Sequence, residues 1–159
     1  MNYNPSLKFI CASFAAVLLA PSALGQSSSS ERQFSEEEAE GIIFERQNIM
    51  GQLHDDTDLL GDIVAGLQPA DRLGPVTASI AQSAQASKEI FALRVPGGRA
   101  KEEVWTNNED YMQRMTEFAD NTARMAELGE ASDMTGVTAM LMTALPCKQC
   151  HDVYRAPKD

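Results

Sequence analysis

The sequence predicts an all-α fold, an antiparallel four-helix bundle. Four stretches carry apolar residues at alternating spacings of three and four, which is the period of an amphipathic helix. Turn signals rich in glycine and proline separate these stretches, and no segment has the pattern of a β-strand pair. Mostly short connections between such helices are typical of a four-helix bundle.

Residues 1–25 are predicted to be a secretory signal peptide and not part of the bundle. Lys8 supplies a basic start, an apolar run follows over residues 9–20, and small residues precede a cleavage point before Gln26. The run is shorter than the roughly 20 residues that a membrane-spanning helix needs. We therefore expect export to the periplasm without membrane insertion.

The first predicted helix opens the folded domain, residues 35–159, which follows a serine-rich flexible segment at residues 26–34. Ser35 with Glu38 three residues later has the pattern of a capping box. Gly66 and Pro69 end the helix. Its inward positions are Ile43, Arg46, Met50, Leu53, Thr57, Leu60 and Val64.

The second and third predicted helices follow the same pattern. Gly74 and Pro75 begin the second helix, which suits proline in a first helical turn. Thr106 with Glu109 predicts another capping box at the start of the third helix. The inward positions are Val76, Ile80, Ser83, Ser87 and Ile90 in the second helix, and Tyr111, Met115, Phe118, Thr122 and Met125 in the third.

The fourth predicted helix begins near Asp133 or Thr135 and continues through Leu141 into a cysteine motif. Pro146, immediately before the first cysteine, removes a helical hydrogen bond and is expected to kink or break this helix. Many inward positions of the four helices are alanine, serine or threonine. A bundle with so few large side chains suggests that a large apolar group lies at its centre.

The cysteine motif is Cys147-Lys148-Gln149-Cys150-His151, the C-x-x-C-H pattern of covalent haem attachment. Helical positions i, i+3 and i+4 share one face, so the two thiols and the imidazole point at the same object. Two thiols can add to the two vinyl groups of a haem while His151 binds the iron. The motif therefore predicts one covalent haem c.

Three other interpretations of the motif are weaker. A structural zinc site needs about four ligands, and the mature chain offers only His54 as another histidine or cysteine. A thioredoxin-like redox pair sits at a helix N-terminus, whereas this pair is expected near the end of the fourth helix. A disulfide would leave the adjacent histidine unexplained.

A second axial ligand has to come from an earlier helix, because the residues after His151 include no methionine or histidine. Met50 is the best candidate, since it shares the inward stripe of the first helix. Ordinary core packing is the alternative for Met50, and it is the role expected for Met115 and Met125. His54, followed by two aspartates, is expected at the surface and is the weaker rival ligand.

The segment Arg46–Met50, the motif Cys147–His151, and Tyr154-Arg155 together resemble the class II cytochromes c, the cytochrome c prime group. Trp105 before the third helix also fits that pattern. The resemblance covers essentially the whole mature chain and implies a four-helix bundle with the haem between the helices.

The resemblance also implies roles for single residues. In the high-spin members a non-coordinating residue stands four positions after the arginine, whereas in the low-spin branch a methionine there binds the iron. Met50 stands at that position and implies the low-spin branch, with His151 and Met50 as axial iron ligands. Arg46 and Gln47 are implied near the haem propionates, and Arg155 near the proximal histidine.

From these features we expect a periplasmic one-electron carrier with a six-coordinate His/Met haem c, and not an enzyme. The alternative is a five-coordinate haem protein that binds nitric oxide or carbon monoxide. The net charge of −10 disfavours nucleic acid and anionic membranes, both of which need a basic face. It suits a redox partner protein with a basic docking face, and the chain is expected to be a monomer or a homodimer.

Overall fold

The computed structural model describes residues 33–158. The predicted signal peptide and residues 26–32 of the predicted flexible segment lie outside this part of the chain. The helices are α1 (Glu36–Val64), a short 3₁₀ turn (Ala70–Arg72), α2 (Leu73–Phe91), α3 (Glu103–Thr106), α4 (Asn108–Glu130), α5 (Met134–Ala144) and α6 (Cys147–Tyr154).

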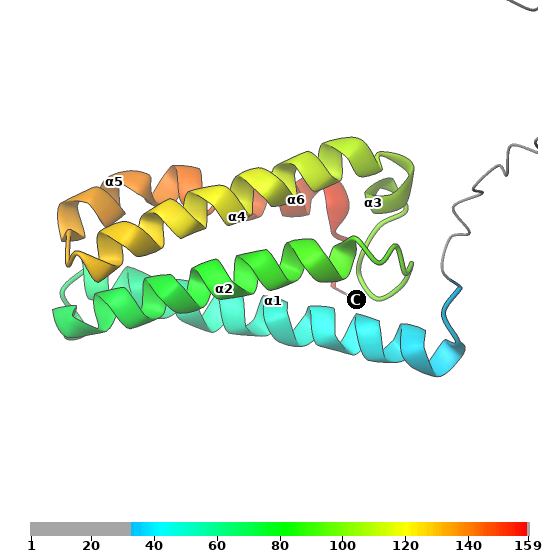
Figure 1. Cartoon of the computed structure of the whole chain (residues 1–159), viewed down its shortest axis with the longest axis horizontal. Coiled ribbons are helices and arrows are strands. Elements are labelled where there is room, and N and C mark those ends of the chain that lie inside the picture. Colours follow the sequence, from blue (N-terminus) through cyan, green and yellow to red (C-terminus); the bar gives the residue numbers. More distant parts are fainter. Residues whose placement is uncertain (1–32, 159) are drawn as a thin grey trace, which may run out of the picture. The chain divides into compact units, whose positions relative to one another are not determined.

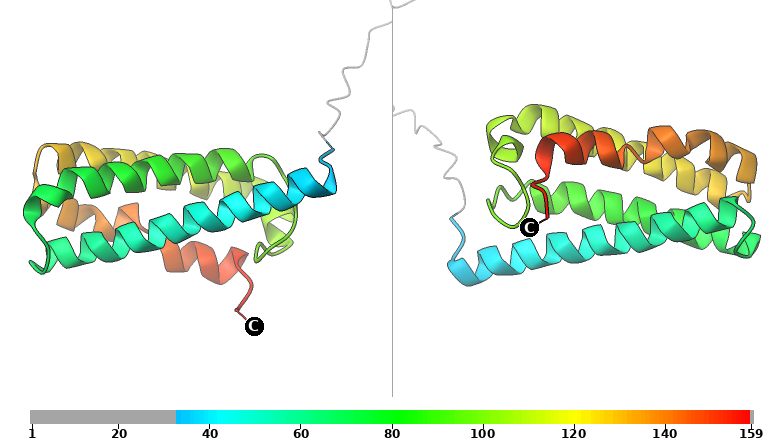
Figure 2. Two further views of the ribbon diagram at one scale, coloured as in Figure 1. Left: turned by 90° about the horizontal axis from the view of Figure 1, so that it is seen from below. Right: turned by 180° about the vertical axis from the view of Figure 1, so that it is seen from behind.

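The long helices form an antiparallel four-helix bundle, as the sequence predicts. Helix α2 packs against both α1 and α4, and α5 packs on α4. Helices α5 and α6 follow one another along the fourth position of the bundle (Figures 1 and 2). The short helix α3 lies in the connection between α2 and α4, where it contacts α6.

The start of α1 confirms the predicted capping box. The backbone N–H of Glu38 donates to Ser35 Oγ over 3.2 Å, and the backbone N–H of Ser35 donates to Glu38 Oε2 over 2.8 Å. These bonds satisfy donors that the first helical turn leaves without partners. The helix ends at Val64, and Gly66 follows with a φ of +74°.

The capping box predicted for the third helix is wrong. Thr106 is the last residue of α3, and its hydroxyl donates to the Glu102 carbonyl oxygen over 3.2 Å. The N-cap of α4 is Asn107, whose side chain makes no capping bond. The Asn107 amide donates instead to the Tyr154 hydroxyl, so a contact with α6 replaces the local cap.

The fourth helix is broken where Pro146 predicts a break. Helix α5 begins after Asp133, whose carboxylate accepts from the backbone N–H of Gly136 over 2.9 Å. It ends at Ala144, and Pro146 is the N-cap of α6. Cys147 is therefore the first residue of a new helix, which takes its own direction (Figure 2).

Two hydrophobic clusters fill the bundle. The first, called here the aliphatic cluster, comprises Leu53, Leu60, Ile63, Leu73, Val76, Ile80, Met125, Val137 and Ala144. The second, called here the aromatic cluster, comprises Phe91, Val104, Tyr111, Met115 and Tyr154. It lies toward the end of the bundle that holds α3 and α6.

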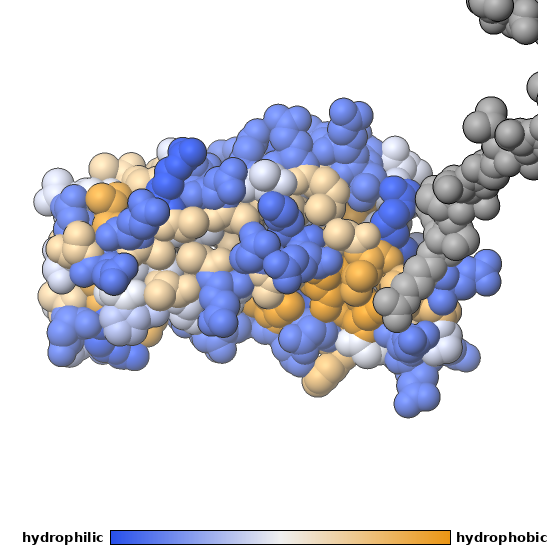
Figure 3. Space-filling view, viewed as in Figure 1, coloured by the Kyte–Doolittle hydropathy of each residue, from blue (hydrophilic) through white to orange (hydrophobic). Residues whose placement is uncertain are grey.

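The surface mixes hydrophilic and hydrophobic side chains, with a hydrophobic area toward the end where α1 begins (Figure 3). The exposed large hydrophobic residues include Phe44 in α1 and Leu93 after α2. Within residues 33–158, no helix is both long enough and apolar enough to cross a membrane.

Candidate haem site

The cysteine motif occupies the first turns of α6. Cys147, Cys150 and His151 stand at positions i, i+3 and i+4 of one helix and therefore share a face. Both thiols are free, Cys147 is exposed, and Cys150 and His151 are half-buried. Two unpaired thiols beside an imidazole on one face are the geometry that covalent haem attachment needs.

The motif does not lie near the end of a helix, where the sequence predicts it. The cysteines lie at the beginning of a helix and not near its end, so the helix dipole does not exclude a thioredoxin-like pair. The thiols themselves argue against such a pair. Burial raises the pKa of both Cys147 and Cys150, whereas a reactive redox thiol has a lowered pKa.

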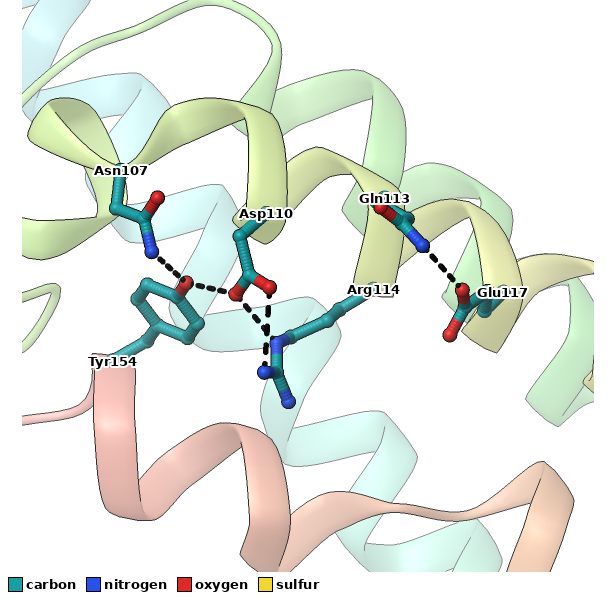
Figure 4. A network of polar contacts seen from close by, with 6 residues as sticks. All are labelled: Asn107, Asp110, Gln113, Arg114, Glu117 and Tyr154. Atoms are coloured by element: carbon teal, nitrogen blue, oxygen red, sulfur yellow. Dashed lines mark hydrogen bonds and ion pairs between the residues drawn. The ribbon is translucent and has the colours of Figure 1, made fainter.

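A polar network fastens the C-terminal end of α6 to α4 (Figure 4). The buried Tyr154 hydroxyl donates to Asp110 in a short hydrogen bond and accepts from the Asn107 amide over 3.1 Å. Arg114 Nε donates to the same Asp110 carboxylate over 2.7 Å. These bonds hold the pKa of Asp110 below its ordinary value, first through Arg114 and then through Tyr154. The network therefore fixes the helix that carries the motif.

The segment 99–101 holds α6 from a second side. Ala100 and Arg155 form an isolated antiparallel bridge, flanked by bonds from Lys101 N to the Tyr154 carbonyl and from Ala156 N to the Arg99 carbonyl. Lys101 Nζ also donates to the carbonyl oxygens of Asp152 and Val153, over 3.2 and 3.1 Å. A cation here satisfies carbonyl oxygens that have no partner within the helix, and the negative end of the helix dipole stabilises it.

Met50 and Cys150 pack against the same aromatic cluster. Met50 belongs to α1 and Cys150 to α6, so the cluster brings the predicted distal and attachment residues to one region of the bundle. Met50 also packs against the aliphatic cluster and is half-buried. Met50 therefore lies at the edge of both clusters and outside the buried core.

Arg46 is buried, as its place on the inward stripe predicts. Its guanidinium donates to the carbonyl oxygens of Val95 and Ile90, over 2.5 and 3.4 Å. The same group lies over the rings of Phe91 and Trp105, at 4.5 and 5.1 Å from the ring centres. Burial lowers the pKa of Arg46 to about 10, so the side chain stays charged at neutral pH.

One atom of this guanidinium has no partner. Arg46 Nε is buried and makes no hydrogen bond. An unpaired buried donor is costly, and an acidic group of a bound cofactor would satisfy it. Gln47, the neighbouring residue, is exposed beside Gly98. The unpaired donor, the free thiols and the half-buried imidazole all fit a haem in this region.

The remaining predicted site residues differ in their surroundings. His54 is exposed and lies 3.8 Å from Asp58, as expected for a surface histidine. Arg155 is exposed at the end of α6, close enough to influence His151. Burial, followed by the charges of Arg155 and Arg99, lowers the pKa of His151. The imidazole is therefore neutral at pH 7 and able to bind a metal.

Sequence reasoning missed the residues that hold α6. Asp110 and Arg114 stand four apart on one helix, a spacing that predicts an ion pair but not its contact with Tyr154. It also missed Asp56, a buried carboxylate of α1 that accepts from Gln52 Nε2 and Ser79 Oγ. An aspartate in a run of acidic residues gives no local sign that it faces inward.

Comparison with known proteins identifies related sequences and folds. The sequence model of the family described as Cytochrome C' matches residues 41–155. A cytochrome c' from Alcaligenes xylosoxydans xylosoxydans is 30% identical over 69 residues. That match spans 43% of this chain and 54% of the relative, so it covers about half of the relative's length.

Solved structures share the fold. Ferric cytochrome c prime from Alcaligenes xylosoxidans superposes with a TM-score of 0.69 at 23% identity, covering 76% of this chain and 97% of that one. Cytochrome c prime from Shewanella frigidimarina gives 0.68 at 25% identity, covering 77% and 100%. A ferrous variant of the Alcaligenes xylosoxidans protein with bound nitric oxide gives 0.69 at 21% identity, covering 79% and 100%.

Proposed function

This chain belongs to the cytochrome c′ family, and from that premise we propose that it is a haem c protein with five-coordinate iron that binds nitric oxide or carbon monoxide. The observation that carries the proposal is the match of residues 41–155 to the family model, and Met50 lies half-buried against both hydrophobic clusters. The nitric oxide complex among the similar structures supports the same choice.

The residues that would hold the haem come from two elements. Cys147 and Cys150 would form the covalent attachments, and His151, on the same face of α6, would bind the iron. Arg46 would donate to an acidic group of the cofactor through its unpaired Nε. The haem supplies an iron centre for one-electron change and for binding a diatomic ligand.

The chain prepares His151 for this role. Burial and the nearby arginines keep the imidazole neutral, and the fastening of α6 to α4 and to segment 99–101 fixes its position. Met50, which packs against the same cluster as Cys150, would place an apolar side chain close to the haem. Apolar surroundings at the iron favour small neutral ligands over anions.

A six-coordinate electron carrier is the second candidate. The residue type at position 50 favours it, since a thioether can bind iron and would raise the potential relative to two histidines. The comparisons do not support this low-spin branch. In either case we propose binding or electron transfer rather than catalytic turnover.

Optical spectra of the purified holoprotein distinguish the two candidates. We expect high-spin ferric and ferrous spectra, and a shift of the ferrous Soret band when carbon monoxide is added. Met50→Leu should preserve these spectra, because the substituted side chain is also apolar. A low-spin ferric spectrum with a sulfur-to-iron charge-transfer band, lost in Met50→Leu, would establish the electron carrier instead.

We also propose that the mature protein is periplasmic. The proposal rests on the signal-peptide pattern of residues 1–25. Mass spectrometry of the protein from a periplasmic extract should give a chain that begins at or near Gln26. A mature chain that keeps Met1 and remains in the cytoplasmic fraction would contradict it.

A further inference from the structure

The cationic side chains near the cysteine motif form a group in an otherwise acidic chain. The chain has a net charge of −10, yet the segment 99–101 and helix α6 with Arg155 hold four cationic residues and one carboxylate, Asp152. The four cationic residues are Arg99, Lys101, Lys148 and Arg155. We call these four residues the basic patch.

Backbone bonds bring the patch together from two distant parts of the chain. The bridge between Ala100 and Arg155 sets segment 99–101 beside the end of α6. Arg99 Nε and Nη2 both donate to the Ala156 carbonyl, over 3.1 and 2.7 Å. Lys101 reaches the carbonyl of Asp152, whose carboxylate pairs with Lys148. These contacts place Arg99, Lys101 and Arg155 at the C-terminal end of α6, and Lys148 reaches toward that end through Asp152.

Most of this positive charge is available to a partner. Arg99 and Lys101 are bonded to carbonyl oxygens, which carry only the partial charge of a helix end, so most of their own charge is not cancelled. Among the described residues, Lys148 is the patch member that pairs with a carboxylate, and that pair is solvent-exposed, with side-chain exposures of 83% and 59%. An exposed pair of this kind is weak and exchanges readily. The acidic residues Glu102 and Glu103, at the start of α3, border the patch.

The patch lies directly beside the attachment residues. Lys148 follows Cys147, which is exposed, and Val153 at the other end of α6 is 42% exposed. An exposed apolar side chain therefore accompanies the cations on this helix.

We propose that the basic patch is a docking surface for a redox protein that presents an acidic face. The inference rests on the haem assignment of the proposed function but not on the coordination number of the iron. It reverses the expectation from net charge, which suits a basic partner face, because cations outnumber carboxylates at this place in an otherwise acidic chain.

A protein partner fits the patch better than an anionic membrane or a nucleic acid. Those surfaces are extended and uniformly negative, so they would also face the acidic remainder of this chain. A localised acidic patch on a protein can meet the four cations and avoid the rest of the surface.

The first test measures electron exchange with a small anion, ferricyanide, by stopped-flow spectroscopy of the ferrous holoprotein. One electron leaves the ferrous iron, which becomes ferric, and ferricyanide becomes ferrocyanide. We expect the rate constant to fall as ionic strength rises, since salt screens the attraction. A rate constant that rises with ionic strength would overturn the proposal, because the net charge of −10 would then control the approach.

Charge variants locate the effect. Lys148→Gln should lower the rate constant about two-fold at low ionic strength and leave it unchanged at high salt, because the Lys148 side chain makes only an exposed ion pair. Arg124→Gln is the matched control, because Arg124 is an exposed cation of α4 outside both patch segments. Equal losses in the two variants would overturn the assignment of the patch.

The second test measures binding without electron exchange. Poly-L-glutamate serves as the acidic probe, and the amide NMR signals of residues 99–101 and 147–158 should shift when it is added to the diamagnetic, carbon monoxide-bound or low-spin ferrous holoprotein. Shifts confined to other residues would overturn the proposal. Binding to phosphatidylglycerol vesicles without a response to poly-L-glutamate would identify a membrane surface instead and would equally overturn it.

Discussion

Arg46 shows how one residue can serve both the fold and the site. Its guanidinium joins the end of α2 to the following loop through the carbonyls of Ile90 and Val95. It also stacks on the rings of Phe91 and Trp105. Its Nε has no hydrogen-bond partner and is the donor that a cofactor could use. The propionate role implied by the resemblance therefore stays a prediction, beside a structural role that the geometry makes plain.

Replacing Arg46 should destabilise the protein strongly. Arg46→Met keeps an unbranched apolar side chain but removes the guanidinium. The two carbonyl oxygens then lose their donor, which predicts a loss of about 2–4 kcal/mol in the free energy of unfolding. Urea unfolding of the holoprotein measures it. Arg124→Met, at an exposed position of α4, should change the stability by less than about 0.5 kcal/mol. Similar losses in the two variants would refute the structural role of Arg46.

At the scale of single elements, α6 is the helix that carries the predicted haem-binding motif and sets its position. Pro146 separates it from α5, so α6 takes its direction from its own contacts. Those contacts are the bonds of Tyr154 with Asp110 and Asn107, and the bonds of segment 99–101 with the helix end. Both sets of bonds involve residues 152–156, which directly follow the half-buried His151, so they restrain the short helix next to the predicted iron ligand.

The Asp110 contact predicts a pH dependence. The pKa of Asp110 in the folded protein lies below its ordinary value of 3.8, so the unfolded chain binds more protons near that pH. Its contribution to stability is therefore present above pH 4 and is lost as the pH falls below it. Asp110→Asn should flatten the acid limb of a stability profile, measured by urea unfolding at pH 3 to 6.

Asp120→Asn provides the comparison for this prediction. Asp120 is an exposed carboxylate of the same helix, and its removal should leave the acid limb unchanged. An acid limb that stays the same in Asp110→Asn would show that the contact with Tyr154 and Arg114 adds nothing to stability.

At the scale of the whole molecule, the two clusters divide the bundle by composition. The aliphatic cluster joins α1, α2, α4 and α5, whereas the aromatic cluster joins α2, α3, α4 and α6. The haem residues belong to the aromatic end, together with segment 99–101. The sequence suggests that a large apolar group lies at the centre of the bundle. In the structure, Cys150 packs against the aromatic cluster, which is the smaller of the two.

Preventing haem attachment should therefore weaken the whole bundle. The double variant Cys147→Ala and Cys150→Ala removes both covalent bonds, and the protein purified from it should melt at least about 10 °C lower, because a tightly held cofactor stabilises only the folded state. Circular dichroism at 222 nm follows the melting. Met142→Ala, at an exposed position of α5, is the control and should have the same melting temperature as the parent protein. An unchanged melting temperature in the double variant would show that the protein part alone supplies the stability.

Much of the fold follows from local signals in the sequence. The capping box at Ser35, the glycine and proline turns and the break at Pro146 all depend on residues a few positions apart, so they can be inferred without the tertiary structure. The capping box predicted at Thr106 is wrong because of a contact that is not local. A contact between Asn107 and Tyr154, distant in the chain, replaced the local cap.

The sequence by itself determined the four helices and the C-x-x-C-H motif, and it predicted His151 as the iron ligand, because these follow from patterns of residues a few positions apart. Only the tertiary structure decided which carbonyls hold Arg46, that Asp110 meets Tyr154, and that four cations gather around α6 in an acidic chain. The physical reason is range. Helical periodicity and caps are local, whereas desolvated hydrogen bonds and the local electrostatic field depend on residues that only folding brings together.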